Sequence, residues 1–264
     1  MQTTTRCNSL FAIGTKPLVL LACVLAMAIP ALATTEQVFH ETCKLPAGGH
    51  FLLDNVNGSV QVEGWDRDEV EIRAVKTSQN DPSDVDLVKI EVESHPGEVD
   101  VHTRYPEGAG AEVAVEYVIH VPNRVLLGSV GTVNGSVRVH GVDGGGELRS
   151  VNGNVEVTES SGRFNAKTTN GNLRLELRHL IDGAPMNLET VNGSVVLGLP
   201  SNASADLNVR NMNGELYSEF PVTSTTALPG ARTYRGRLGH GGGAPISVRT
   251  VNGGIRLLLE HPGV

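Results

Sequence analysis

The amino-acid sequence predicts an all-β protein whose fold is a single-stranded parallel β-solenoid, or β-helix, with rungs of 18–22 residues. Three observations lead to this prediction. The phrase TVNGSVRV at Thr132–Val139 returns in close variants along the chain, and such self-similarity at a short period is typical of stacked repeat folds. Apolar and polar residues alternate after each copy, which is the period of a strand. Glycine is frequent, aromatic residues make up only 4% of the chain, and no long stretch has helical spacing.

Residues 1–33 have the pattern of a secretory signal peptide. Arg6 and Lys16 form a basic start, an apolar run covers Pro17–Ile29, and Ala31-Leu32-Ala33 offers a small-x-small cleavage site. The apolar run is too short, and wrongly flanked, for a membrane span. We therefore expect residues 34–264 to form one exported solenoid domain in the periplasm, on the cell surface or outside the cell. No integral membrane segment is expected after cleavage.

Charge and cysteine content narrow the range of partners. Loss of the signal removes two positive charges and takes the formal net charge from −8 to −10, which disfavours nucleic acid and anionic membrane surfaces. A lipoprotein signal ending at Cys23 is the alternative, but the apolar run continues to Leu32, which favours cleavage after Ala33. Cys43 is then the remaining cysteine, either a small buried residue or half of an intermolecular disulfide.

Seven Asn-Gly pairs mark the predicted corners of the repeat. Successive pairs are 77, 18, 18, 22, 21 and 39 residues apart, so that the first gap is close to four repeats and the last is close to two. Glycine supplies the permissive backbone that a sharp bend needs. The pairs are Asn57 and Gly58, Asn134 and Gly135, Asn152 and Gly153, Asn170 and Gly171, Asn192 and Gly193, Asn213 and Gly214, and Asn252 and Gly253.

Apolar residues stand two and four places after most of these glycines, as Val155 and Val157 do after Gly153. Period-two alternation means that one face of each strand points into a core. The position between them carries Arg138, Glu156 and Arg174 in successive repeats. We expect these charges to form an alternating ladder on the outer surface.

Two architectures are compatible with this repeat. Asn-Gly between alternating apolar residues is a strong signal for a two-residue hairpin, so an antiparallel β-meander or sandwich is the alternative fold. A hairpin turn accepts Asp-Gly or Gly-Gly equally well, however. In a parallel solenoid, equivalent Asn side chains lie roughly 4.8 Å apart and can hydrogen-bond along the stack. The persistence of Asn therefore favours the solenoid.

Several phrases resemble a known bacterial family. VNGSVQVEGWDRDEVEIRAVK at Val56–Lys76, VNGSVRVHG, VNGSVVLGLPSNASADLNV and LGHGGGAPISVRTVNGGIRL are similar to the putative-adhesin family, a domain of unknown function with β-strand repeats. The similarity covers about Phe51 to Leu259. It implies a repetitive parallel β fold on an exported protein and suggests adhesion, and the family offers no catalytic residues to carry over.

The stretches between clear repeats are harder to assign. Val88–Glu93, Glu98–Arg104 and Glu112–Val121 alternate well and are expected to form irregular turns of the solenoid. His179–Pro185 and Pro221–His240 are expected to be loops that bulge from the stack.

Few residues suggest chemistry. A calcium β-roll needs a recurring Asp within its nonapeptide, and the segments GNVEVTESS and GRFNAKTTN have none. Asp100, His102 and Arg104 alternate along one expected strand, so they could share an outer face, and Trp65 could stack on a sugar ring. A solvated strand surface and a strand-end cover are the simpler interpretations of these residues. We expect no catalytic residues, no metal site and no cofactor.

The sequence thus favours an exported, non-enzymatic protein with a structural or adhesive role. Expected partners are a glycan, other cell-envelope material or a protein, and the end rungs could mediate self-association. Two alternatives remain: a carbohydrate-active β-helix enzyme, and an exported component of an envelope-stress response.

Overall fold

The computed structural model describes residues 35–78, 81–106, 112–180, 184–228, 231–239 and 243–260. The expected signal peptide lies outside these ranges and stays a prediction. The loop expected at His179–Pro185 lies partly outside them, since residues 181–183 are not described.

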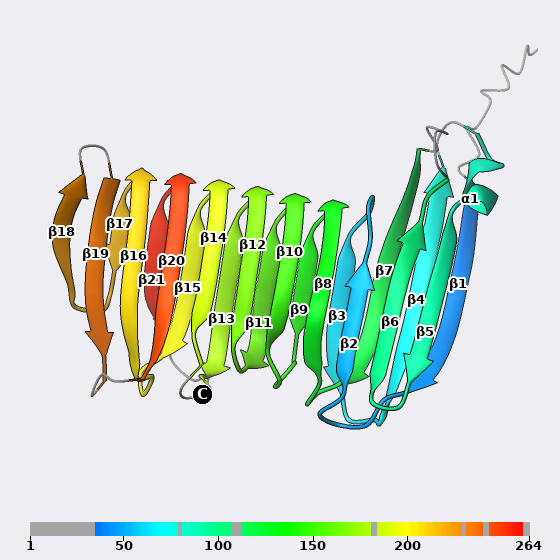
Figure 1. Cartoon of the computed structure of the whole chain (residues 1–264), viewed down its shortest axis with the longest axis horizontal. Helices are drawn as coiled ribbons and strands as arrows, with labels where there is room; N and C mark the ends of the chain where they lie inside the picture. The colour runs from blue at the N-terminus through cyan, green and yellow to red at the C-terminus, as the bar shows by residue number, and fades with distance from the viewer. Residues whose placement is uncertain are drawn as a thin grey trace, which may run out of the picture. The chain divides into compact units, whose positions relative to one another are not determined.

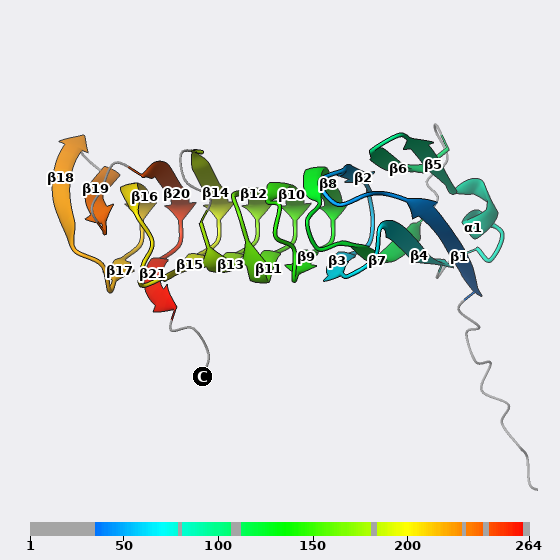
Figure 2. The same ribbon diagram turned by 90° about the horizontal axis from the view of Figure 1, so that it is seen from below.

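The described chain forms two β-sheets that face each other (Figures 1 and 2), with one four-residue helix, α1 (Asp84–Leu87). Sheet A has ten strands in the order β1 (Thr35–Lys44), β4 (Glu69–Ser78), β7 (Val113–Pro122), β3 (Val60–Trp65), β9 (Val137–His140), β11 (Val155–Ser161), β13 (Leu173–His179), β15 (Val195–Pro200), β21 (Ile255–Glu260) and β17 (Leu216–Ser218). Sheet B has eleven strands in the order β18 (Val222–Leu228), β19 (Ala231–Leu238), β16 (Ala205–Asn213), β20 (Ala244–Asn252), β14 (Met186–Asn192), β12 (Phe164–Asn170), β10 (Gly146–Asn152), β8 (Leu126–Asn134), β2 (His50–Asp54), β6 (Glu98–Arg104) and β5 (Lys89–His95). The all-β prediction is confirmed.

The centre of the molecule is the predicted parallel solenoid. Each turn contributes one strand to sheet B and the next to sheet A, as β10 is followed by β11 and β12 by β13. Neighbouring turns pair in parallel: β10 pairs with β12 with Asn152 opposite Asn170, and β11 pairs with β13 with Val155 opposite Leu173. The antiparallel meander is therefore wrong for this part of the chain.

The apolar residues after each Asn-Gly pair fill the space between the sheets. Val155, Leu173 and Val195 are fully buried, and the residues between them in sequence point outward. Arg138 and Glu156 lie opposite each other on β9 and β11, and Glu156 lies opposite Arg174 on β13. Burial of these stacked apolar columns stabilises each turn through its neighbours, as in other solenoids.

The N-terminal end follows the prediction of irregular solenoid turns only in part: β6 and β7 stack in parallel on β2 and β3, but the other strands do not continue the stack. Asn57 lies directly beside Asn134, so the 77-residue gap contains no stacked Asn-Gly turns. Instead, β4 pairs antiparallel with β1 and β7, and β5 pairs antiparallel with β6. The reversal between β5 and β6 occurs at Pro96-Gly97, where Gly97 has φ +81, a conformation that suits a tight hairpin turn.

The C-terminal end brings two further corrections. The last turn in the sequence, β20 and β21, lies between β14–β15 and β16–β17, so Asn252 neighbours both Asn192 and Asn213. The described part of Pro221–His240 is not a loop, because β18 and β19 pair antiparallel and extend sheet B beyond β16. Its Ser- and Thr-rich first strand lies at the sheet edge, where burial does not demand the apolar alternation by which strands are recognised.

Replacing Val155 with Asp should unfold the solenoid cooperatively. Val155 is fully buried, and an uncompensated carboxylate there is expected to cost about 4 kcal/mol or more. Urea unfolding followed by circular dichroism measures the change. The neighbouring variant Glu156→Asn is the control, because this outward side chain makes long ion pairs worth at most about 1 kcal/mol. Equal stability of the two variants would contradict the inward assignment of Val155.

Candidate functional site

The Asn residues of the seven corners form one continuous side-chain ladder. The Nδ2 atom of each Asn donates to the Oδ1 atom of the Asn in the adjacent turn, and all six bonds are 2.8–2.9 Å long. The ladder follows the spatial order Asn57, Asn134, Asn152, Asn170, Asn192, Asn252 and Asn213. It lies at the edge of the core, where most of these side chains are exposed.

A second, buried column runs beneath the ladder. The residue two places before each Asn is usually Thr or Ser, and its hydroxyl donates to the carbonyl of the corner glycine in the adjacent turn. Thr168 donates to Gly153 at 2.8 Å and Thr190 donates to Gly171 at 2.9 Å. Thr132, Ser150 and Thr250 repeat the pattern. Asn55 and Asn211 take this position in the two terminal turns.

Close stacking explains the glycine of each pair. A Cβ atom at Gly153 would overlap the carbonyl oxygen of Gly135 in the adjacent turn. The backbones therefore approach too closely for any other residue, and the Asn-Gly phrase is a requirement of stacking.

The Asp100, His102 and Arg104 side chains lie on the outer face of sheet B but do not form one cluster. His102 Nε2 lies 3.2 Å from Asp100 Oδ2, and His102 Nδ1 lies 3.7 Å from Asp54 Oδ2. Arg104 is bound instead to Glu91 on β5, at 2.9 Å. Sequence reasoning missed Asp54, because the register that places β2 beside β6 cannot be read from either strand alone.

The Trp65 ring is in contact with other residues of the same chain. The ring stacks on His120 with centroids 5.1 Å apart, the Arg67 guanidinium lies 4.6 Å from the ring centroid, and Nε1 donates to the Glu69 carbonyl at 2.8 Å. These contacts fit a structural cover better than an open sugar platform.

The Trp65 ring belongs to a row of charged and imidazole groups across sheet A. His120 lies 3.3 Å from both Glu63 and Glu71, and His40 lies 2.8 Å from Glu71. The hydrogen bond from His40 lowers the pKa of Glu71, with a smaller contribution from the His120 charge. Four strands supply this row, so only the sheet register reveals it. Within the described ranges, no group of three or more His, Cys, Asp or Glu could hold a metal ion.

The outer face of sheet B has a trough along β8. In the middle of this strand the outward positions carry Gly128, Ser129 and Gly131, which are shorter than the side chains of the strands on either side, and the exposed Leu126 and Val133 lie at its two ends. Two depressions of about 430 and 470 Å³ lie end to end over β8. At Gly131, one wall is Asp54 on β2 and the other is Arg149 on β10, since these are the side chains nearest to a Cβ placed there.

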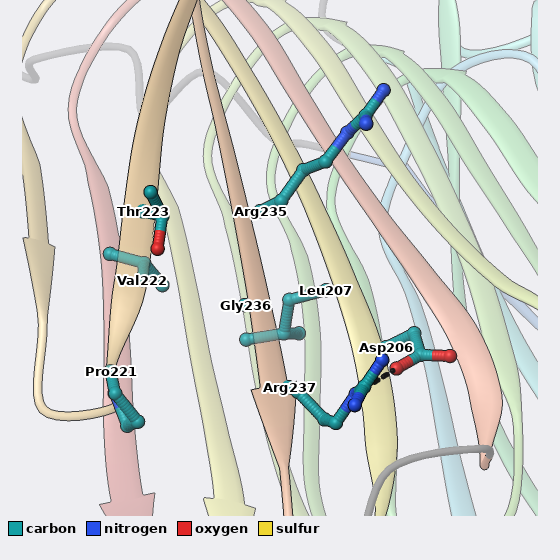
Figure 3. Close-up of a pocket in the computed structure, with 8 residues that line it drawn as sticks. All are labelled: Asp206, Leu207, Pro221, Val222, Thr223, Arg235, Gly236 and Arg237. Carbon is teal, nitrogen blue, oxygen red and sulfur yellow. Dashed lines mark ion pairs between the residues drawn. The ribbon is translucent and has the colours of Figure 1, made fainter.

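A third depression, of about 610 Å³, lies over β16, β18 and β19 (Figure 3). Arg237 pairs with Asp206 at 3.5 Å, whereas Arg235 points away from this pair. The charged groups therefore do not converge on one point, and the depression is less suited than the trough to hold a ligand.

The fold and the ladder define this protein as a parallel β-solenoid stacked through Asn-Gly corners. More particularly, the chain belongs to the Toastrack DUF4097 family, whose model matches residues 49–257. This match confirms the resemblance to a domain of unknown function with β-strand repeats. No curated protein matches the chain.

Solved structures with some likeness come from bacteria. A putative cell adhesion protein from Clostridium sporogenes has 9% identity and a TM-score of 0.46, over 85% of this chain and 100% of that one. A putative adhesin from Bacteroides fragilis has 10% identity and a TM-score of 0.38, over 85% and 97% of the respective chains. No helix in the described part of the chain is long and apolar enough to cross a membrane.

Replacing Asn170 with Ala should destabilise the protein about twice as much as replacing Asn213 with Ala. Asn170 makes two ladder bonds and Asn213, at the end of the ladder, makes one. At about 1 kcal/mol per bond, the expected losses are about 2 and 1 kcal/mol, measured by urea unfolding. Equal losses, or none, would show that the ladder does not stabilise the stack.

Proposed function

We propose that the protein is an exported, non-enzymatic adhesive module that holds a polar polymer of the cell envelope in the trough over β8. The observation that carries this proposal is the trough itself. Small outward residues in the middle of β8 lie between charged side chains of the neighbouring strands, and the two depressions together follow this nine-residue strand from Leu126 to Val133.

The chemistry of the walls favours a glycan. One wall offers the carboxylate of Asp54 and the other offers Arg149 and Lys167, with Ser129 on the floor. Carboxylates, cations and hydroxyls arranged along a groove can hydrogen-bond to successive sugar hydroxyls, and few precisely placed polar groups are enough for orientation. Asn165 and Arg163 continue these polar contacts in the second depression.

Non-enzymatic binding is supported by the charge arrangement around the trough. Glycoside hydrolysis needs two carboxyl groups on opposite sides of the scissile bond. Asp54 and Asp100 lie on the same side of β8, with His102 between them. On the opposite wall the lining carboxylate, Glu147, is bound to Arg149 in an ion pair, and Arg149 and Lys167 make the rest of that wall cationic.

Retention on insoluble envelope glycan tests the proposal. The protein purified after expression of the full coding sequence is applied to peptidoglycan, chitin and cellulose, and both retention and new reducing ends are recorded. Gly131→Gln should abolish retention, because it fills the trough. A Cβ at Gly131 would meet its nearest neighbours at 3.5–3.9 Å, so the fold should accept the change.

The control is Arg138→Gln on the outer face of sheet A, which should keep full retention. Loss of retention in both variants, or in neither, would place binding elsewhere. Release of reducing ends that stops in Asp100→Asn would establish a carbohydrate-active enzyme instead.

A further inference from the structure

The two ends of the Asn ladder are not equivalent. Every ladder bond has the same direction, with Nδ2 donating toward the N-terminal end of the stack. Within the ladder, Asn57 therefore donates to no other corner Asn, and Asn213 accepts from none. The backbone has the same polarity, because each corner glycine N–H donates to the Asn carbonyl of the adjacent turn on the C-terminal side of the stack, as Gly193 donates to Asn252 and Gly253 to Asn213 at 2.9 Å.

The N-terminal end of the ladder is covered by strand β7. Val115 N donates to the Asn57 carbonyl at 2.7 Å and Tyr117 N donates to the Ser59 carbonyl at 2.9 Å. Asn55, the first residue of the buried column, donates from Nδ2 to the Val115 carbonyl at 2.9 Å. The first turn thus has a neighbouring strand on its outer side.

The C-terminal end has no such cover among the described residues. Sheet A ends at the three-residue strand β17, while sheet B continues through β19 and β18. Glu215 and Glu219 face β21, since the Glu215 carbonyl accepts from Ile255 N and Glu219 N donates to the Leu257 carbonyl. The N–H and C=O groups of Gly214 and Leu216 therefore point away from β21, as alternate residues of a parallel strand do.

Asn211 is the independent sign that a partner belongs here. Asn211 is 2% exposed, yet neither its Nδ2 nor its Oδ1 has a hydrogen-bond partner among the described residues. A buried amide without partners is costly, whereas all five inner positions of the column carry a Thr or Ser hydroxyl that donates to a corner glycine, as Thr190 and Thr250 do. A locally unfavourable residue of this kind is expected at a functional position.

We propose that the outer edge of β17 binds an extended polypeptide segment of another protein, which adds to sheet A as a parallel strand. Its backbone carbonyls would accept from the N–H groups of Gly214 and Leu216, and a side-chain donor at its corner position would meet Asn213 Oδ1. Asn211 lies beside this edge with amide groups available for the added strand. Main-chain pairing at an exposed sheet edge is a common mode of peptide recognition. Tyr217, 53% exposed, would gain a cross-strand neighbour.

A second copy of this chain fits the edge less well than a peptide does. Beyond the first turn, sheet A has three further strands and sheet B has two, whereas beyond the last turn sheet B has two and sheet A has none. Sheet A thus extends one strand beyond sheet B at the N-terminal end, whereas sheet B extends two strands beyond sheet A at the C-terminal end. The ends of two copies placed end to end would not be complementary. They could not continue both sheets at once.

A synthetic peptide provides the probe. The segment Thr190–Leu199, TVNGSVVLGL, carries the corner phrase of an internal turn, and added terminal lysines would keep it soluble. Labelled peptide should bind the full-length protein in a fluorescence anisotropy titration. The same peptide with Val196→Pro should not, because it lacks the N–H that would donate to the Leu216 carbonyl. Absence of specific binding by the first peptide would overturn the proposal.

Two variants at position 216 test whether the outward N–H of this edge strand takes part in binding. Leu216→Ala and Leu216→Pro both remove the side chain, but only the proline removes the outward N–H, a change that edge strands accept. The proline variant should bind the peptide at least about tenfold more weakly than the alanine variant, with a similar urea midpoint. Equal affinity of the two variants would contradict strand addition. A concentration-dependent dimer in light scattering that only the proline variant loses would identify a second copy as the occupant instead.

Replacing Asn211 with Thr gives a further test, in which stability and peptide affinity should change in opposite directions. Thr restores the hydroxyl used by the internal turns, so the urea midpoint should rise, while peptide affinity should fall several-fold. A rise in stability with unchanged affinity would show that Asn211 takes no part in binding. Because this surface is remote from Gly131, the trough variant Gly131→Gln should bind the peptide normally, so that failure of the proposed glycan binding and failure of strand addition are distinguishable.

Discussion

The structure depends on the in-register parallel stacking of identical corners. Once one Asn-Gly turn lies directly over the next, three sets of hydrogen bonds form together: the Asn amide ladder, the buried hydroxyl column, and the bonds between corner backbones. Each set fixes the same register, and a slip by one residue would break all three while turning the apolar columns outward. Hydrophobic burial supplies most of the stabilisation, and the polar ladders supply the specificity of the register.

This constraint also explains where function can lie. Inside the stack every position is dictated by its neighbours above and below, so variation is free only on the outer faces and at the ends. The trough exists because one strand, β8, has small residues where its neighbours have long ones. The charged row around His120 and the His102 contacts are likewise built from outward positions of different strands, brought together by sheet register and not by proximity in sequence.

The sequence was informative wherever the repeat itself decides the structure. The identity of Asn at each corner predicted the parallel stack over a meander, and alternation predicted the inward residues such as Val155 and Leu173. The N-terminal strands could not be predicted in the same way, because β4 to β7 carry no corner phrase. β6 and β7 still stack in parallel on β2 and β3, but β4 and β5 pair antiparallel through registers that only tertiary packing determines. The spatial order of the last turns was also hidden, since the phrases at Asn213 and Asn252 fit either neighbour. One signal could have revealed the ends: Asn replaces Thr or Ser two places before the corner only at Asn55 and Asn211. Strand alternation placed Asp100, His102 and Arg104 on one face, but cross-strand partners, which the sequence does not show, separated Arg104 from the other two.

The insertion of β20 and β21 between earlier turns has a consequence for how the molecule is completed. A chain that emerges from its N-terminus can add turns in order as far as β14 and β15, because each new turn stacks on one already made. The strands β16 and β17 cannot pair with the stack at that stage, because β20 and β21, which join them to it, are synthesised later. The last strands to appear thus lock the C-terminal block in place. A chain cut short by even one turn would lose its connection to that block, so the architecture distinguishes finished molecules from unfinished ones.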